Sequence, residues 1–98
     1  MAKNVSNETA FWFCTTSGSI GKIAHNLHEF AECLRTVPTE SLEFHLRDDK
    51  NDFEAWLKKI MGETKLAKSF TRIKSKNLRG NELRKALEKI ANEIVEST

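Results

Sequence analysis

The sequence has few cysteines, prolines and glycines, and no long apolar run. Among its 98 residues are two cysteines, one proline and four glycines. Two cysteines, Cys14 and Cys33, do not make the dense disulfide framework of a small secreted fold, so we expect reduced thiols in a cytoplasmic protein. No apolar run approaches the roughly 20 residues that span a bilayer, so we expect no membrane association. Residues 1–9 are polar and lack the apolar centre of a secretory signal, and we expect a flexible tail there.

The composition that is present is typical of one folded domain. Hydrophobic residues make up 39% and charged residues 31% of the chain, a balance that suits a globular protein and not a disordered one. A chain of this length can form one hydrophobic core but not two. We therefore expect residues 10–98 to form a single helical domain.

The charges are unevenly distributed, although the net charge of +2 is too small to indicate a polyanionic partner by itself. Residues 1–64 carry seven Lys/Arg and ten Asp/Glu, a net charge of −3, whereas residues 65–98 carry nine and four, a net charge of +5. Six basic residues follow one another with no acid between them. This basic face consists of Lys65, Lys68, Arg72, Lys74, Lys76 and Arg79. Such a polar molecule could stack head to tail or offer its basic end to an anion.

Apolar residues recur at the spacing of three and four that one face of a helix requires. The clearest stripe predicts a helix over residues 20–34, formed by Ile20, Ile23, Ala24, Leu27, Phe30, Ala31 and Leu34. Pro38 ends this helix and suits the first turn of the next, over residues 39–47. A third helix is predicted between Asn51, whose capping box includes Glu54, and Gly62. Two more are predicted over residues 64–74 and after Asn81.

Residues 10–16 are aromatic and prone to form a strand. Phe11 and Phe13 alternate with Trp12, which gives the period of two of a strand over a very short length. Ser17 or Ser19 is predicted to cap the helix that follows. The fold class predicted from these patterns is all-α, a compact bundle or orthogonal array of about five short helices with a short N-terminal strand or extended arm.

Metal binding and catalysis both need side chains that converge, and the pattern predicts neither. On a helix, His25, His28 and Cys33 point in different directions, so they cannot easily share a metal ion with Cys14. No cysteine or serine lies in a segment typical of an activated nucleophile, and a domain this small has little room for a substrate pocket. We expect no metal, no cofactor and no enzymatic activity.

His45, Asp52 and Trp56 have two interpretations. His45 lies on the apolar face of its predicted helix, seven residues before Asp52. It could be a histidine at the edge of the core, packed on Trp56 or Phe53 with one nitrogen bonded to a carboxylate or carbonyl. Alternatively, His45, Asp52 and Trp56 could together contact a ligand or partner.

The basic face likewise has two interpretations. It could be the solvated side of a helix and a loop, or it could contact phosphates. Lys65, Lys68 and Arg72 do share one stripe of the predicted helix. Single-stranded nucleic-acid binding usually adds exposed aromatic side chains, and Phe70 is predicted to be buried.

Several short motifs occur in a characteristic order. They are Thr15 to Gly18, Ala24-x-x-Leu27-x-x-Phe30, Val37-Pro38, Ser41-Leu42-x-Phe44-His45, Asp52-Phe53-x-x-Trp56-Leu57, Gly62 with Leu66-Ala67, and Gly80-x-x-Leu83-Arg84. Together they resemble an uncharacterised prokaryotic family, the domain of unknown function 5752, over about residues 10 to 90. Asn51 departs from the pattern, which has a glycine before the aspartate. The resemblance implies a module found alone or attached to other proteins, some of them related to sugar metabolism, and it implies no activity or site residues.

We expect a helical domain that functions by binding, as a protein-interaction or regulatory module that self-associates, for example as a homodimer. Its partner would be another protein or a second copy of the chain. Two alternatives stay open. One is a nucleic-acid-binding protein that uses the basic face, the less favoured partner, and the other is a small-ligand or sugar-phosphate sensor around His45 and Trp56.

Overall fold

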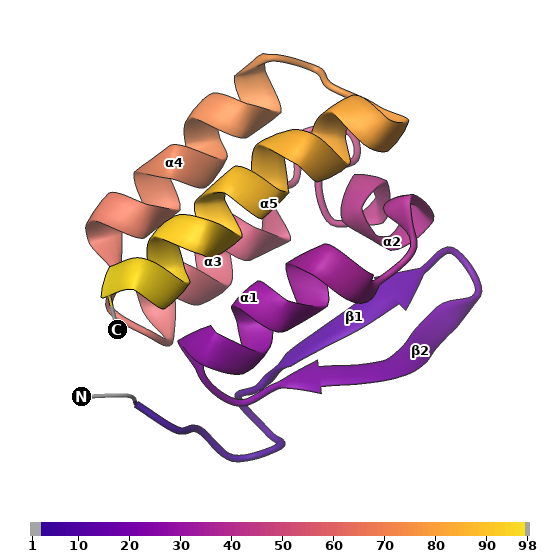
Figure 1. The fold of residues 1–98 in the computed structure, drawn as a ribbon. Coiled ribbons are helices and arrows are strands. Elements are labelled where there is room, and N and C mark those ends of the chain that lie inside the picture. Colours follow the sequence, from indigo (N-terminus) through magenta and orange to yellow (C-terminus); the bar gives the residue numbers. More distant parts are fainter. Residues whose placement is uncertain (1–2, 98) are drawn as a thin grey trace.

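The computed structural model describes residues 3–97 and contains five helices and a two-stranded antiparallel sheet (Figure 1). The strands are β1 (Phe11–Thr15) and β2 (Gly18–Ala24). The helices are α1 (Leu27–Thr36), α2 (Thr39–Phe44), α3 (Asp52–Lys59), α4 (Thr64–Ser75) and α5 (Gly80–Ser97). The prediction of an all-α fold is therefore wrong, because the N-terminal aromatic segment pairs with a second strand.

The second strand occupies residues that were predicted to begin the first helix. Gly18 and Gly21 have φ angles of +112° and +79°, which glycine adopts without steric cost and which a regular helix does not allow. The register shifts between Phe13 and Cys14, so the hairpin contains an irregularity of the β-bulge type. The helix begins only at Leu27, where the Asn26 side chain caps it by accepting from the Glu29 N–H at 2.8 Å.

The hairpin forms because β1 has one apolar face that the helices cover. Phe11 and Phe13 are buried and Trp12 between them is 42% exposed, as the alternation of a half-buried strand requires. Phe11 packs on Phe30 of α1, with 5.6 Å between ring centroids, and stacks on Phe53 of α3 at 5.2 Å. The aromatic strand β1 thus forms one side of the hydrophobic core. In a fold made only of helices, another helix would have to cover that side.

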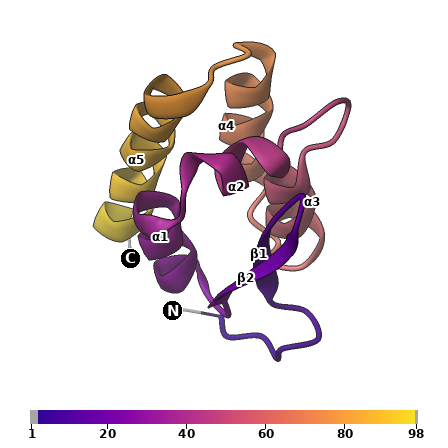
Figure 2. The same cartoon turned by 90° about the vertical axis from the view of Figure 1, so that its right-hand side faces the viewer.

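The helices pack in pairs around this aromatic centre. α1 packs mainly on α5 and α3 on α4, while β1 contacts α2 and β2 contacts α1. Figures 1 and 2 show the hairpin at one end of the molecule and α4 at the other, with α5 running antiparallel beside α4. Within residues 3–97, no helix is both long and apolar enough to cross a bilayer.

The Asn51 and Gly62 signals of α3 are confirmed, whereas the predicted Asn81 cap is wrong, because α5 already begins at Gly80. The Asn51 side chain caps α3 by accepting from the Glu54 N–H at 3.1 Å, and Gly62 has a φ of +69° after that helix. α2 is shorter than predicted and ends at Phe44, with His45 as its C-cap residue. The apolar stripes predict a core of nine residues, of which Leu27 is half-buried at the start of α1. The other eight are buried: Phe30, Phe53, Trp56, Leu57, Phe70, Leu83, Leu87 and Ile90.

Part of the predicted N-terminal tail contacts the domain. The Val5 N–H donates to the His25 carbonyl at 2.8 Å, and the Lys3 ammonium donates to the Ile60 carbonyl at 2.6 Å. Residues 1 and 2 of the predicted tail lie outside the described residues. That residues 3–9 are flexible stays a prediction, and two of them, Lys3 and Val5, are hydrogen-bonded to the folded domain.

Replacing Leu87 with alanine tests the position of the core. Leu87 is fully buried on α5, so Leu87→Ala should lower the free energy of unfolding by about 2–5 kcal/mol. Lys89→Ala, an exposed change on the same helix, should alter it by less than about 0.5 kcal/mol. Chemical denaturation of both variants measures this, and equal stabilities would contradict the helix orientation described above.

Candidate functional site

His45 and Asp52 form a hydrogen-bonded pair that closes a loop. His45 Nδ1 lies 2.9 Å from Asp52 Oδ2, and the Asp52 N–H donates to the His45 carbonyl, also at 2.9 Å. The other ring nitrogen, Nε2, accepts from the backbone N–H of Cys14 in β1 at 3.0 Å. The ring is 4% exposed, so both its nitrogens are bonded within the protein and neither is available to a ligand.

These bonds determine the protonation state of His45. A backbone N–H can only donate, so Nε2 must be the unprotonated acceptor and Nδ1 carries the proton that is donated to Asp52. Burial lowers the pKa of His45 below its ordinary value of 6.5, although the hydrogen bond and negative charge of Asp52 act in the opposite direction. The folded protein therefore holds a neutral ring.

Trp56, the third predicted binding residue, does not join this pair. Its indole N–H donates to the Thr9 carbonyl at 2.8 Å, and its ring is 6% exposed. The Phe11 ring contacts both side chains, with centroids 4.7 Å from His45 and 5.7 Å from Trp56. His45 and Asp52 thus meet as predicted, whereas Trp56 packs in the core and bonds to the N-terminal segment.

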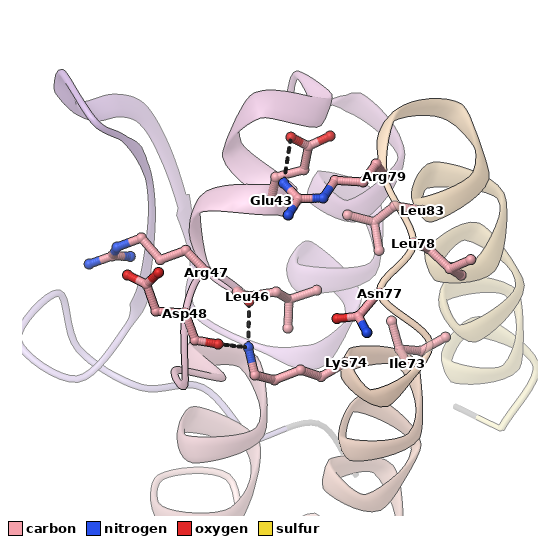
Figure 3. A pocket seen from close by; sticks show the side chains of 10 residues that line it. All are labelled: Glu43, Leu46, Arg47, Asp48, Ile73, Lys74, Asn77, Leu78, Arg79 and Leu83. Atoms are coloured by element: carbon pink, nitrogen blue, oxygen red, sulfur yellow. Dashed lines mark hydrogen bonds and ion pairs between the residues drawn. The ribbon is translucent and has the colours of Figure 1, made fainter.

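The loop that His45 and Asp52 close borders a pocket of about 270 Å³ (Figure 3). We call it the polar pocket; it lies between this loop, the end of α4 and the link to α5. Its lining residues are Glu43, Leu46, Arg47, Asp48, Ile73, Lys74, Asn77, Leu78, Arg79 and Leu83. Two residues predicted for the basic face, Lys74 and Arg79, therefore meet the His45 loop here.

Lys74 holds the loop against α4. Its ammonium donates to the carbonyls of Leu46 at 2.5 Å and Asp48 at 2.8 Å (Figure 3). An ammonium group has three N–H donors, so one remains for another acceptor. Asp48 and Asn77, on opposite sides of the pocket, are the two non-glycine residues with positive φ within the described chain, at 54° and 53°. Asp and Asn are the non-glycine residues that adopt this left-handed backbone most readily, and Asn77 does so just past the end of α4.

A carboxylate and a guanidinium face each other at the other end of the pocket. Glu43 Oε2 accepts from the Gly80 N–H at 2.8 Å, at the first residue of α5. Glu43 Oε1 lies 4.0 Å from Arg79, whose side chain is 80% exposed. Arg47 is directed elsewhere, since its guanidinium lies over the Phe44 ring, 3.9 Å from the centroid, and donates to the Phe44 carbonyl at 2.7 Å.

The rest of the predicted basic face lies outside the pocket. On a helix, Lys65, Lys68 and Arg72 project from the side of α4 opposite its buried residues, and Lys76 continues the same stripe. All four are exposed. Phe70 is fully buried, as predicted, and within residues 3–97 the exposed large hydrophobic side chains are Trp12 and Val95, which lie on other elements. The stripe thus offers charge without a stacking surface.

The cysteines do not complete a catalytic arrangement with His45. Only the backbone of Cys14 reaches the ring; its thiol lies 3.5 Å from the Trp12 carbonyl. Cys33 is buried, and this burial raises the pKa of its thiol. Among residues 3–97, no three His, Cys, Asp or Glu side chains are grouped closely enough to hold a metal ion.

Several pocket residues carry no sequence signal. Glu43 and Gly80 are 37 positions apart, and nothing in either segment indicates that a carboxylate of α2 would bond to the start of α5. Asn77 lies in the segment expected only to be a loop. Asparagine is common at turn positions that need left-handed backbone, and this preference was the one sequence signal that could have drawn attention to Asn77.

Replacing His45 with glutamine tests the neutral ring. Below about pH 6.5 an unfolded histidine takes up a proton that folded His45, with its lowered pKa, does not. The unfolded state then binds more protons, so stability should fall as the pH decreases through this range. His45→Gln should cost about 1–3 kcal/mol at pH 7.5 and lose less further stability at pH 5 than the wild type does. Denaturant titrations at both pH values measure this.

The control for that experiment is His28→Gln, an exposed change that should leave the wild-type pH dependence in place. If His45→Gln and the wild type lost equal stability on acidification, His45 would not be the group responsible.

Among known proteins, the chain matches one family model. The family model described as "Family of unknown function (DUF5752)" matches residues 2–92, which confirms the resemblance seen in the motifs. No curated protein and no solved structure matches the chain.

Proposed function

We propose that this chain, which belongs to the family of unknown function DUF5752, is a regulatory binding module that takes a small anionic ligand in the polar pocket. The observation that carries the proposal is the meeting of Lys74 and Arg79, from two different segments, in one hollow of about 270 Å³. We place the ligand in the polar pocket and not against Trp56 or the His45 ring, because both of these side chains are hydrogen-bonded within the core.

The pocket suits an anion of about the size of a phosphate group with a short organic part. Its volume of about 270 Å³ is slightly below the range of drug-sized small-molecule sites, about 300–1,000 Å³, so only a small ligand fits. Arg79 is largely exposed and can turn toward a bound oxyanion, and the third N–H of Lys74 and the amide of Asn77 can donate beside it. A planar guanidinium with a nearby ammonium is a common means of recognising phosphate.

Glu43 acts in this proposal as an internal competitor. Its carboxylate already accepts the Gly80 N–H and faces Arg79, so it occupies the position that an anion would otherwise take. A ligand dianion must displace this side chain or bind against its charge, which weakens affinity. Displacement would release α2 from the start of α5 and so transmit binding to the fold, as a regulatory module requires.

The lining of the pocket supports binding in preference to catalysis. It contains carboxylates, cations and an amide but no histidine, cysteine or serine. Lys and carboxylate side chains can also act as nucleophiles when they are activated, but here Lys74 donates to two backbone carbonyls and Glu43 accepts the Gly80 N–H. His45 is close in sequence to the pocket loop, yet its role there is to position the loop through Asp52.

Phosphate titration tests the pocket. Inorganic phosphate and glycerol 3-phosphate are added at constant ionic strength while the backbone amide signals of Asn77 and Gly80 are followed by NMR. Both signals should shift. Arg79→Gln should weaken binding about tenfold, because it removes a charged hydrogen-bond donor. Glu43→Gln should strengthen binding about three- to tenfold, because it removes a like charge and keeps an acceptor for Gly80.

The matched control is Lys76→Gln, which removes a nearby exposed cation that does not line the pocket. It should leave the affinity unchanged. Equal losses in Lys76→Gln and Arg79→Gln would indicate diffuse attraction to a basic surface and would contradict the proposal, as would weaker binding in Glu43→Gln. Preference for glycerol 3-phosphate over phosphate would identify a phosphate monoester as the ligand.

Nucleic-acid binding by the outer stripe of α4 is the second candidate, favoured by the shared exposure of Lys65, Lys68, Arg72 and Lys76. We expect it to be weak, with a dissociation constant of about 10⁻⁴–10⁻⁶ M or higher at physiological salt, because no aromatic side chain is exposed on that face. Filter binding of mixed oligonucleotides to wild type and to Lys68→Glu/Arg72→Glu measures this. Sub-micromolar binding that survives physiological salt and is lost in the double variant would establish this candidate instead.

A further inference from the structure

A second hollow, of about 290 Å³, lies away from the polar pocket and is lined by residues from the start of α1, the start of α4 and the end of α5. Figure 1 shows these three helix ends on one side of the molecule. We call it the apolar groove. Its floor is made by Leu27 and Leu66, both half-buried and within reach of water, above the buried Ile94. Val95, which is 38% exposed, follows on the same turn of α5. An apolar centre that water can reach is typical of contact surfaces for other proteins.

The rim of the groove carries charges of both signs. Glu63 and Lys65 approach it from α4 and its N-cap, and Glu93 approaches it from α5. Within residues 3–97 none of these three side chains forms an ion pair. A surface with an apolar centre and a charged rim has the anatomy of a protein interface.

We infer that the apolar groove is a self-association surface whose occupant is the same groove of a second copy of this chain. A two-fold axis brings one patch against itself, so the patch must be complementary to its own charges. This rim satisfies that condition, because the Lys65 ammonium of one copy can face the Glu63 or Glu93 carboxylate of the other. A partner of a single charge sign would leave part of the rim opposed to like charge.

The size of the groove makes this dimer a weak one. Stable interfaces bury about 1,200–2,000 Å² in total, and smaller contacts are transient. Seven lining residues, the six floor and rim residues named above and Ser69, form a small contact, so dimerisation should depend on protein concentration. The inference does not rest on ligand binding in the polar pocket, since the two hollows share no residue.

Sedimentation velocity from about 10 µM to 1 mM protein tests the inference. The wild type should show a concentration-dependent dimer. Lys65→Glu makes the rim wholly acidic and should weaken dimerisation at least about fivefold, and Lys65→Glu/Glu93→Lys, which restores both signs, should recover most of it. All these positions are exposed, and circular dichroism and melting temperature verify that each variant is folded.

Lys68→Glu is the matched control, because Lys68 lies on the next turn of α4 and does not line the groove. It should leave dimerisation unchanged, and so should Arg79→Gln, which separates this experiment from failure of the anion site. A monomer at every concentration would overturn the inference. So would a dimer that is insensitive to Lys65→Glu, or a double variant that associates no better than the single one.

Discussion

The hydrogen bonds of the His45 ring are the interaction on which the rest of the arrangement depends, because they join three segments of different kind. The ring accepts the Cys14 N–H of β1 and donates to Asp52 at the start of α3, while His45 itself ends α2. It also packs against the buried Phe11 and Phe13 rings, with centroid separations of 4.7 and 5.9 Å. A hydrocarbon ring could fill this space, but it would leave a buried strand N–H without an acceptor, which costs free energy.

The shape of the proposed ligand pocket follows from that contact. Because the His45–Asp52 pair closes the loop between α2 and α3, Leu46 and Asp48 face the end of α4, where Lys74 bonds to their carbonyls. This loop and the end of α4 together border the polar pocket. His45 and Asp52, which were expected to bind a ligand directly, instead position the loop that borders the proposed ligand pocket.

The basic residues of the C-terminal third are divided among separate surfaces of the molecule. The nine cations of residues 65–98 do not act as one surface, because the helical period of α4 sends Lys74 toward the pocket and Lys65, Lys68 and Arg72 to the outside. Lys65 reaches the apolar groove as well. A basic run that is continuous in sequence thus serves the pocket, the groove and the solvated face separately.

The sequence by itself determined most of the helices, since caps and apolar stripes act over a few residues: the Asn51 cap of α3, the glycine at position 62 and the buried faces of α4 and α5 could all be predicted. It could not show that Ile20, Ile23 and Ala24 belong to a strand, because their spacing also fits a helix and only pairing with β1 decides between the two. That His45 and Asp52 meet could also be predicted, because the two residues are only seven positions apart in the sequence. Tertiary structure alone decided that Glu43 would bond to Gly80 and that Lys74 would reach Leu46, because these contacts join segments 37 and 28 positions apart and depend on how whole helices pack.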